Sequence, residues 1–488
     1  MPKQLSRNLA QNWAVLQDMF GSSGDFYAKQ IQIQGVDAAI VLFDNLAGLS
    51  DFWDMALERI SRPHAAQRWQ AMAGGDALYA YLMHQSDLPA EPKPVQTWDE
   101  VVSMTTAGFS LLFLDDCDKA LAFSVQAMKQ RSVQTPSAEG NVRGSREGFC
   151  DLLRVNISLL RRMVRTATFA AETIQSETAL KTEYALCYDK AAADPKKVEV
   201  IRQRLASARP PVLLDSSYFV PWLGIRGIRL FSPVGYTERP AVASAKIREG
   251  KILVMVNGSP SALILPYLFL ENFTCLDDYA GPAYFATLLR LLKLAAFFLT
   301  ITLPGLFITT AGYAPQLLPP ELLYKIAAAE RGTPLPLFAE MLVVILVLEI
   351  IREAGLRMPD ALGSSVSLVA ALIVGDAAIS AGVLSTYVIL VAAVTSIAMF
   401  VTPALYEPAS LLRVLFLLAG GICGPVGLAA VAVFALLALS TPELLDVPYM
   451  TMLMPVKHSL WIDGLLRRKL PVLARRDKVV HGRKEPEI

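Results

Sequence analysis

Acidic side chains within long apolar stretches are the residues in this sequence whose chemistry stands out. Asp376 follows one apolar segment and precedes another, and Glu340 and Glu349 lie inside a third. A carboxylate in a bilayer costs about 2.5–3.5 kcal/mol on insertion scales, so it must face water or a partner. In a ring of identical chains, Asp376 would form a circle of negative charge that favours cations. The alternative is that Asp376 lies hydrated and inert at the end of a span.

Glu349 and Arg352 are spaced to form an ion pair. Residues three apart lie on the same side of a helix, so the two side chains can meet. Glu340 precedes Glu349 by nine residues, which at about 100° per residue places the two carboxylates on opposite faces. We predict the pair Glu349–Arg352 either as a structural contact at the end of a span or as a gating element.

Small and hydroxyl-bearing residues accompany Asp376 along the segment 363–382. Small residues let helices approach closely, and hydroxyl groups can bond across helix interfaces. Tight packing and a polar pore lining both explain this composition. The candidate pore-lining residues are Ser367, Gly375, Asp376 and Ser380.

A second charged region lies between residues 131 and 162, where arginines alternate with acidic residues. Guanidinium groups make forked bonds to carboxylates, which fixes the orientation of packed surfaces. The candidate subunit-interface residues are Arg143, Arg146, Glu147 and Arg154. An anion-binding site is the alternative for the same cluster.

Signatures of other chemistry are missing from the sequence. The five cysteines are dispersed without CxxC spacing, and HExxH, GxSxG and Walker patterns do not occur. The stretch 257–260 (NGSP) fits a turn between strands rather than a phosphate loop. A net charge of +1 offers no field that gathers nucleic acid. We expect no catalytic residues, no cofactor, no metal and no nucleic-acid partner.

The elements that carry these residues divide into a soluble and a membrane part. Hydrophobic residues make up 53% of the chain and charged residues 18%, above the globular norm for apolar content. The stretch 291–311 has one charge, Lys293, and the stretch 378–401 has none; about 20 helical residues cross a bilayer. We predict α+β or α/β cytoplasmic subdomains over 1–130 and 131–281, a transmembrane helical domain over 282–445, and a basic cytoplasmic tail over 446–488.

In the soluble part, alternating apolar residues predict strands and hairpins. One hairpin combines Lys29–Gln34 with Ala38–Phe43, and another strand pair combines Phe109–Leu114 with Ala120–Val125. Apolar residues at helical spacing predict an amphipathic helix over Phe149–Arg165. Helices are also expected over Leu46–Ile60, Asp76–His84, Trp98–Thr106 and Lys196–Ala208.

In the membrane part, we expect spans at Tyr284–Ala311, at Leu337–Ile351, from Ala378 onward, and at Leu411–Leu439 with a break at Gly420–Gly427. The short segment Val366–Val374 fits a half-helix, and 312–336 reads as a proline-rich loop. Four crossings, or five or six if the glycine-rich break divides the last segment, are compatible with the pattern. Basic loops prefer the cytoplasm, and the N-terminus shows no secretory signal, so both termini are expected inside.

Several sequence blocks resemble the A subunits of the GerA family of spore germination receptors, in the right order from about Asn12 to about Arg476. The blocks are Arg131–Arg162 (RSVQTPSAEGNVRGSREGFCDLLRVNISLLRR), Tyr236–Pro240 (YTERP), Gly250–Pro266 (GKILVMVNGSPSALILP), Asp277–Leu292, Leu303–Ile308 (LPGLFI), Glu349–Pro359 (EIIREAGLRMP), Gly363–Gly382 and Val447–Tyr449 (VPY). The chain departs from the family at Asp376, where an uncharged polar residue is usual, and at Thr441–Leu445.

The resemblance implies a multi-pass subunit of the spore inner membrane that assembles with itself, as a pentamer, into a nutrient-gated ion channel. Opening of the channel releases cations at the start of germination. The implied partners are a transporter-like B subunit, a lipoprotein C subunit and membrane lipid. A family sibling similar to stage V sporulation protein AF amplifies ion release without sensing a nutrient. A secondary transporter and a non-conducting membrane scaffold are the alternatives.

Overall fold

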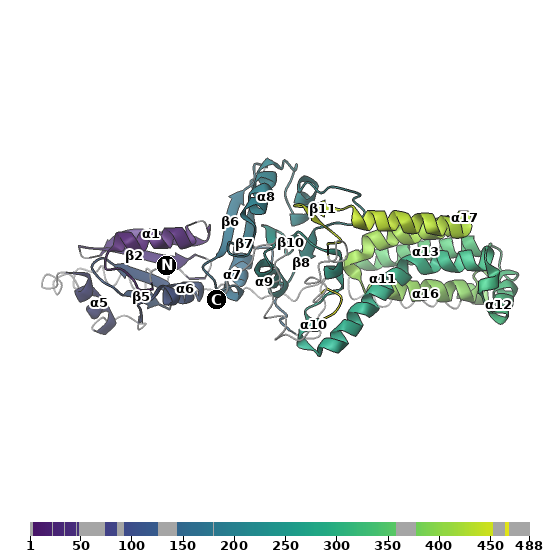
Figure 1. Ribbon diagram of the computed structural model, residues 1–488, viewed down its shortest axis with the longest axis horizontal. Coiled ribbons are helices and arrows are strands. Elements are labelled where there is room, and N and C mark those ends of the chain that lie inside the picture. Colours follow the sequence, from purple (N-terminus) through teal and green to yellow (C-terminus); the bar gives the residue numbers. More distant parts are fainter. Residues whose placement is uncertain are drawn as a thin grey trace.

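The structure is a computed structural model, and it describes residues 3–21, 23–33, 35–44, 46–47, 74–84, 92–124, 144–178, 180–357, 377–451 and 464–467. Three parts follow one another along the long axis: a first α+β subdomain, a second α+β subdomain and a bundle of long helices (Figure 1). The predicted fold class, two soluble subdomains followed by a helical bundle, is confirmed.

The first subdomain is built on a five-stranded antiparallel sheet with strand order β1-β2-β4-β5-β3. Its strands are β1 (Phe26–Ile33), β2 (Val36–Phe43), β3 (Lys93–Val95), β4 (Ser110–Leu114) and β5 (Ala120–Phe123), and its helices are α1 (Leu9–Phe20), α5 (Gly75–His84) and α6 (Trp98–Thr106). Apolar residues of α1 and α6 fill one face of the sheet, and those of α5 fill the other. The predicted hairpin β1–β2 is confirmed. The helix expected over Leu46–Ile60 lies almost wholly outside the described residues.

The second subdomain repeats this plan with strand order β6-β7-β9-β10-β8, again antiparallel. Its strands are β6 (Phe169–Gln175), β7 (Glu183–Asp189), β8 (Gly235–Thr237), β9 (Ile252–Val256) and β10 (Ala262–Leu265), and its helices are α7 (Leu153–Met163), α8 (Pro195–Ser207), α9 (Pro240–Arg248) and η2 (Ser216–Trp222). Helices α7 and α9 cover one face, and α8 and η2 the other. The stretch 257–260 is the expected turn, between β9 and β10.

Arg161 of α7 joins the two subdomains. Its guanidinium group donates to both carboxylate oxygens of Asp25 at 3.1 and 2.8 Å, and also to the Ser23 hydroxyl at 2.7 Å. The same group lies over the rings of Phe43 and Phe169, at 4.1 and 4.6 Å from their centroids. Both charged side chains are essentially inaccessible to solvent, so the pair fixes how the first subdomain sits on the second.

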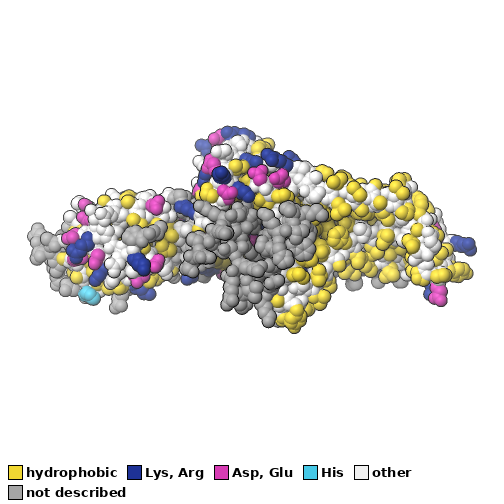
Figure 2. Space-filling view, viewed as in Figure 1, with side chains coloured by type: hydrophobic (Ala, Val, Ile, Leu, Met, Phe, Trp, Pro, Cys, Tyr) yellow, Lys and Arg dark blue, Asp and Glu magenta, His cyan; other side chains and the backbone are white. Residues whose placement is uncertain are grey.

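The helical bundle begins with η3 (Phe269–Phe273) and α10 (Asp277–Ala280) at the edge of the second subdomain. Its further elements are α11 (Ala283–Gly312), η4 (Pro315–Leu317), α12 (Pro320–Glu330), α13 (Leu337–Arg357), α15 (Ala378–Ser380), α16 (Thr386–Phe400), η6 (Pro403–Leu405) and α17 (Tyr406–Ser440). Figure 2 shows hydrophobic side chains covering the visible face of this bundle, with charges gathered on the soluble part and at the far tip.

Two of the sequence expectations for the bundle are wrong. The proline-rich stretch 312–336 contains helix α12, because Pro320 occupies the first helical position, where its missing N–H costs nothing. The span expected from Ala378 is not continuous. Helix α15 stops at Ser380, Gly382 adopts a left-handed φ of 67°, and α16 starts only at Thr386.

Two described stretches, Ala283–Gly312 and Pro403–Ser440, are long and apolar enough to cross a membrane. The second one is not a single rod. Gly424 has φ 61° and ψ −141°, followed by Pro425, and a Cβ on Gly427 would lie 2.2 Å from the Ala419 carbonyl oxygen. The chain therefore folds back on itself at Gly424, as the expected break at Gly420–Gly427 predicts, and each half of α17 is about 25 Å long.

Replacing Arg161 with alanine should lower the free energy of unfolding by about 3–5 kcal/mol, because Asp25 would stay buried without its counter-charge. The matched control is Arg154→Ala, which removes a 3.6 Å pair with Asp44 between the same subdomains whose side chains are 69% and 50% exposed. That loss should be about 0–1 kcal/mol. Urea titration of the full-length protein in detergent, monitored by tryptophan fluorescence, measures the free energy of unfolding of both variants. Equal losses would contradict the assignment of the Arg161–Asp25 pair as the main contact between the subdomains.

Candidate functional site

The junction between the second subdomain and the bundle is held by a buried charge network, here called the junction cluster: Lys246, Lys251 and Glu271. Lys246 lies in α9, Lys251 directly precedes β9, and Glu271 lies in η3, which leads into the bundle. The Lys246 ammonium group donates to Glu271 Oε1 at 2.7 Å, and that of Lys251 contacts both carboxylate oxygens. Glu271 also accepts the backbone N–H of Leu268 at 2.8 Å. One carboxylate thus joins helix α9 and the beginning of strand β9 to the start of the bundle.

Electrostatics in the junction cluster favour an ionised Glu271. Burial disfavours its charge, but the ammonium groups of Lys246 and Lys251 outweigh burial and lower the pKa of the carboxyl to about 2. Burial, together with the like charge of Lys246, lowers the pKa of Lys251 to about 8. At neutral pH the cluster therefore carries a buried anion between cations.

An aromatic cluster extends the junction into the bundle. Phe269 and Phe273 of η3 contact the ring of Phe297 in α11, at centroid distances of 5.9 and 6.1 Å. Phe231 and Tyr449 stack at 6.2 Å in the same group. The middle of α11 and the chain that follows α17 therefore pack into one core beside the second subdomain.

The chain returns to the second subdomain after α17. Thr441 Oγ1 accepts the backbone N–H of Ile228 at 3.3 Å, and the backbones of Arg226 and Glu443 pair as an isolated bridge. Leu444 and Leu445 enter the core of that subdomain. Both ends of the bundle are therefore attached to the same soluble unit.

A second buried pair lies at the first turns of α11. Arg290 donates to Asp278 of α10 at 2.7 Å and to the carbonyl oxygen of Gly464 at 3.0 Å, and both charged side chains are fully buried. The backbone N–H of Arg467 donates to Thr287 of α11 at 3.0 Å. The described part of the C-terminal region, 464–467, thus packs on the entrance of α11.

Within the bundle, five polar side chains of α13 and α17 form what we call the helix cluster: Glu349, Arg352, Tyr406, Ser410 and Arg413. Glu349 accepts hydrogen bonds from Arg352 at 3.0 Å, Arg413 at 2.6 Å, Ser410 at 2.5 Å and the Tyr406 hydroxyl. The Arg352 guanidinium lies 3.5 Å from the Tyr406 ring centroid. The candidate pair Glu349–Arg352 is present in the structure, and its role in gating stays a prediction.

The sequence prediction missed the α17 half of the helix cluster. Arg413 is the one charge inside the predicted span Leu411–Leu439, and its side chain is only 3% exposed. A lone arginine in an apolar stretch signals a buried acidic partner, and this signal could have found it. Its partner could not be chosen from the sequence, because Glu349 is 64 residues away.

An open groove of about 690 Å³ borders the helix cluster. Arg352, Glu353 and Glu407 supply charges to its lining, and Leu411 and Val414 supply an apolar wall. Burial, followed by the Asp215 and Glu407 carboxylates, raises the pKa of Tyr236 in β8. The groove thus combines opposite charges and an apolar surface.

Close helix packing explains several small residues of the bundle. A Cβ on Gly305 of α11 would lie 2.5 Å from the carbonyl oxygen of Phe416, and one on Gly420 would lie 2.6 Å from Thr309 Oγ1. Thr309 donates to the carbonyl oxygen of Gly420 at 3.1 Å. Helices α11 and α17 therefore approach at a distance that larger side chains would prevent.

The structure describes only some of the candidate site residues. Ser367, Gly375, Asp376 and Arg143 lie outside the described residues. Ser380 is exposed at the end of α15, and Arg146 is exposed before α7. The other two interface candidates pair within the chain: Glu147 accepts from Arg162, and Arg154 pairs with Asp44. The subunit-interface role of these four residues stays a prediction.

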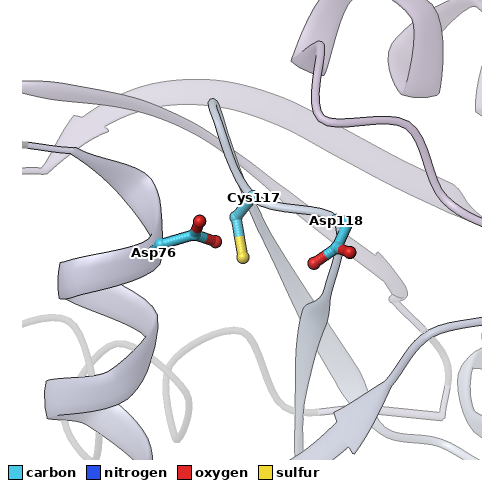
Figure 3. Close-up of side chains that lie close together, drawn as sticks. All are labelled: Asp76, Cys117 and Asp118. Carbon is cyan, nitrogen blue, oxygen red and sulfur yellow. The ribbon is translucent and has the colours of Figure 1, made fainter.

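Asp76, Cys117 and Asp118 bring three possible metal ligands close together, with ligand atoms within 4.8 Å of one another (Figure 3). Burial raises the pKa of the Cys117 thiol to about 11, and Asp76 pairs with Arg7 at 2.8 Å. A metal ion here would have to displace the thiol proton and compete with Arg7 for Asp76. The absence of a metal site stays an expectation.

An apolar bundle held by buried charges to the second of two α+β subdomains is typical of a membrane-associated protein with a large soluble part. The sequence model of the Bacillus/Clostridium GerA spore germination protein family matches residues 14–479. The chain belongs to this family.

Named relatives match over most of their length. Spore germination protein KA of Bacillus subtilis is 30% identical over 99% of this chain and 90% of its own. Stage V sporulation protein AF of the same organism is 27% identical over 81% and 80%. The crystal structure of the N-terminal domain of the A subunit of the Bacillus megaterium spore germinant receptor GerK3 aligns with a TM-score of 0.43 and 22% identity, covering 55% of this chain and 98% of that one.

Replacing Glu349 with alanine should lower the free energy of unfolding of the detergent-solubilised protein by about 3–5 kcal/mol, because Arg413 would remain buried without an acidic partner. The melting temperature should fall accordingly. Glu353→Ala is the control, since that carboxylate is 50% exposed and its partner Arg357 is 80% exposed; about 0–1 kcal/mol is expected there. Differential scanning fluorimetry of both variants measures the difference. Similar melting temperatures would show that the helix cluster does not hold α13 to α17.

Acid should weaken the junction cluster. Because the folded pKa of Glu271 is about 2 against an ordinary value of 4.5, its contribution to stability is complete above pH 4.5 and is lost as the pH falls towards 2. The loss should be roughly 3 kcal/mol. Urea titrations between pH 5 and about 2.5 measure it. In Glu271→Gln the free energy of unfolding should change less over the same pH range, although the variant is already less stable at pH 7. If the free energy of unfolding of this variant fell with pH as steeply as that of the wild type, Glu271 would not be the group responsible.

Proposed function

We propose that this chain is the A subunit of a spore germination receptor and that copies of it assemble, as a pentamer, into a nutrient-gated ion channel. The observation that supports this proposal is the family match over nearly the whole chain, combined with an apolar bundle joined to a large soluble region. Opening would release cations at the start of germination. The protein would act by conduction rather than by catalysis.

In this proposal the pore is lined by the segment that contains Ser367, Gly375, Asp376 and Ser380. A ring of Asp376 carboxylates would raise the local concentration of cations and repel anions. Small residues beside it would let neighbouring helices approach the axis. The helices α11 and α17 would face lipid, which their exposed leucine, isoleucine and valine side chains support.

The soluble region would couple nutrient sensing to the pore. The junction cluster attaches the second subdomain to the start of the bundle, so a movement of this subdomain would reach α11 directly. The helix cluster would then serve as the gating contact, because Glu349 and Arg352 lie where α13 meets α17. Arg143, Arg146, Glu147 and Arg154 would lie at or near contacts between protomers in the ring.

We place the protein in the spore inner membrane with both termini in the cytoplasm. The domain limits would be 1–130, 131–281, 282–445 and 446–488. Reversal of the chain at Gly424 supports counting the two halves of α17 as separate crossings. Since termini on the same side require an even number of crossings, this favours six crossings over four. A transporter-like B subunit that binds the nutrient, a lipoprotein C subunit and membrane lipid would complete the receptor.

A second candidate function is amplification of ion release without nutrient sensing. The similarity to stage V sporulation protein AF over most of both chains supports this second candidate. The two candidates differ in partners, so co-purification from sporulating cells distinguishes them: B and C subunits of a receptor indicate the nutrient receptor, and their absence with persistent conduction indicates the amplifier.

The purified protein in liposomes tests conduction itself. Unitary currents support a channel, saturable substrate exchange would indicate a secondary transporter, and silence of an assembled oligomer would indicate a scaffold. Native mass spectrometry of the same preparation gives the number of protomers, with five expected.

Replacing Asp376 with asparagine should reduce cation preference, because the ring would lose its negative charge. The measurement is the reversal potential under a potassium chloride gradient, which should move towards zero. Glu321→Gln is the matched control, since Glu321 is exposed in the first turn of α12 and should leave the reversal potential unchanged. Unchanged selectivity in Asp376→Asn would remove this residue from the selectivity mechanism.

A further inference from the structure

Glu340 is a buried carboxylate at the end of the bundle away from the soluble subdomains. It lies in the first turn of α13, the helix that follows α12 in the chain, and Figure 1 shows α12 at the far tip of the molecule. Its relative exposure is 0%. The core that fills this end of the bundle is made of apolar side chains such as Leu337, Met341, Leu384 and Val388. Glu340 is therefore a charge-bearing group in apolar surroundings.

The other buried acids of the described residues show what Glu340 lacks. Asp25 pairs with Arg161, Asp189 with Arg248, Glu271 with two lysines, and Asp278 with Arg290. Among the described residues, no lysine, arginine or histidine forms an ion pair with Glu340. A bare carboxylate in a low-dielectric interior costs several kcal/mol, so either a proton or a bound cation must neutralise it.

Two oxygen atoms at this position are available to a ligand. The backbone N–H of Ser385 donates to Glu340 Oε2 at 3.0 Å and fixes the carboxylate. Glu340 Oε1 and Ser385 Oγ are both buried, and neither has a hydrogen-bond partner. Ser385 lies in the turn between α15 and α16, which Gly382 bends with its positive φ. A carboxylate oxygen and a hydroxyl oxygen are thus held on facing elements.

We propose that Glu340 and Ser385 form a binding site for one monovalent alkali cation inside each protomer. Hard cations prefer carboxylate and hydroxyl oxygens, which are the atoms offered here. One positive charge neutralises the single carboxylate, whereas a divalent ion would leave a net charge buried. A water molecule could accept and donate hydrogen bonds at the site but would not neutralise the charge.

Glu340 and Ser385 lie in one chain, on α13 and directly before α16, so binding there does not depend on a ring or on conduction. A bound cation would hold α13 to the turn before α16 and so stabilise the bundle by mass action.

Thermal unfolding of the full-length protein in nanodiscs of zwitterionic lipid tests the site. Wild-type protein should melt at a higher temperature as potassium or sodium chloride replaces N-methylglucamine chloride at constant ionic strength, and the effect should saturate. Glu340→Gln should lose this dependence and should melt higher than wild type without alkali ions, because no charge remains to neutralise. Ser385→Ala should need a higher cation concentration for the same effect. Glu330→Gln, an exposed carboxylate at the end of α12, is the control and should behave as wild type.

Several results would overturn the proposal. One is equal melting in alkali and N-methylglucamine salts. Another is stabilisation by acid alone, which would make a proton the occupant. A third is a cation dependence that persists in Glu340→Gln. If that variant does not fold, retention of radioactive rubidium by wild type and Ser385→Ala decides, and equal retention would refute the site. None of these results bears on conduction, so the channel proposal is tested separately.

Discussion

Neutralisation of buried charge is the constraint on which the architecture depends. A charge removed from water is tolerated only with a well-placed opposite charge, and losing one partner is costly. In this chain such pairs lie at the joints. Arg161 with Asp25 joins the soluble subdomains, the junction cluster joins soluble part and bundle, and Glu349 with Arg413 joins two helices. Apolar packing gives each part its core, and the ion pairs fix how the parts meet.

Within the bundle, where apolar surface alone gives little preference between neighbours, small residues and hydroxyl groups take over that task. Gly305 and Gly420 bring α11 against α17, and Thr309 bonds across the contact. Gly424 does something different, because its left-handed backbone reverses the chain. The same residue type thus allows close approach in one place and a change of direction in another.

Much of the soluble fold could be predicted from the sequence, because strand alternation and helix caps are local signals. The hairpin β1–β2 and the helix expected over Lys196–Ala208, which the structure shows as α8 with Asp194 as its N-cap, are examples. Helix α12 was missed, since prolines that start a helix look like prolines that end one. Glu349 and Arg352 could be paired from their spacing, whereas Arg413 could not be matched to Glu349, because only the folded bundle brings α13 and α17 together.

The attachment of both ends of the bundle to one soluble unit has a mechanical consequence. Since α11 leaves the second subdomain and the chain returns to it after α17, a rotation of that subdomain would move these two helices together, as a single lever. Helix α13 contributes no residue to the aromatic core at that joint among those described, and it is held to the lever through Glu349. Rotation of the second subdomain would therefore strain the hydrogen bonds of Glu349 before it moved α13.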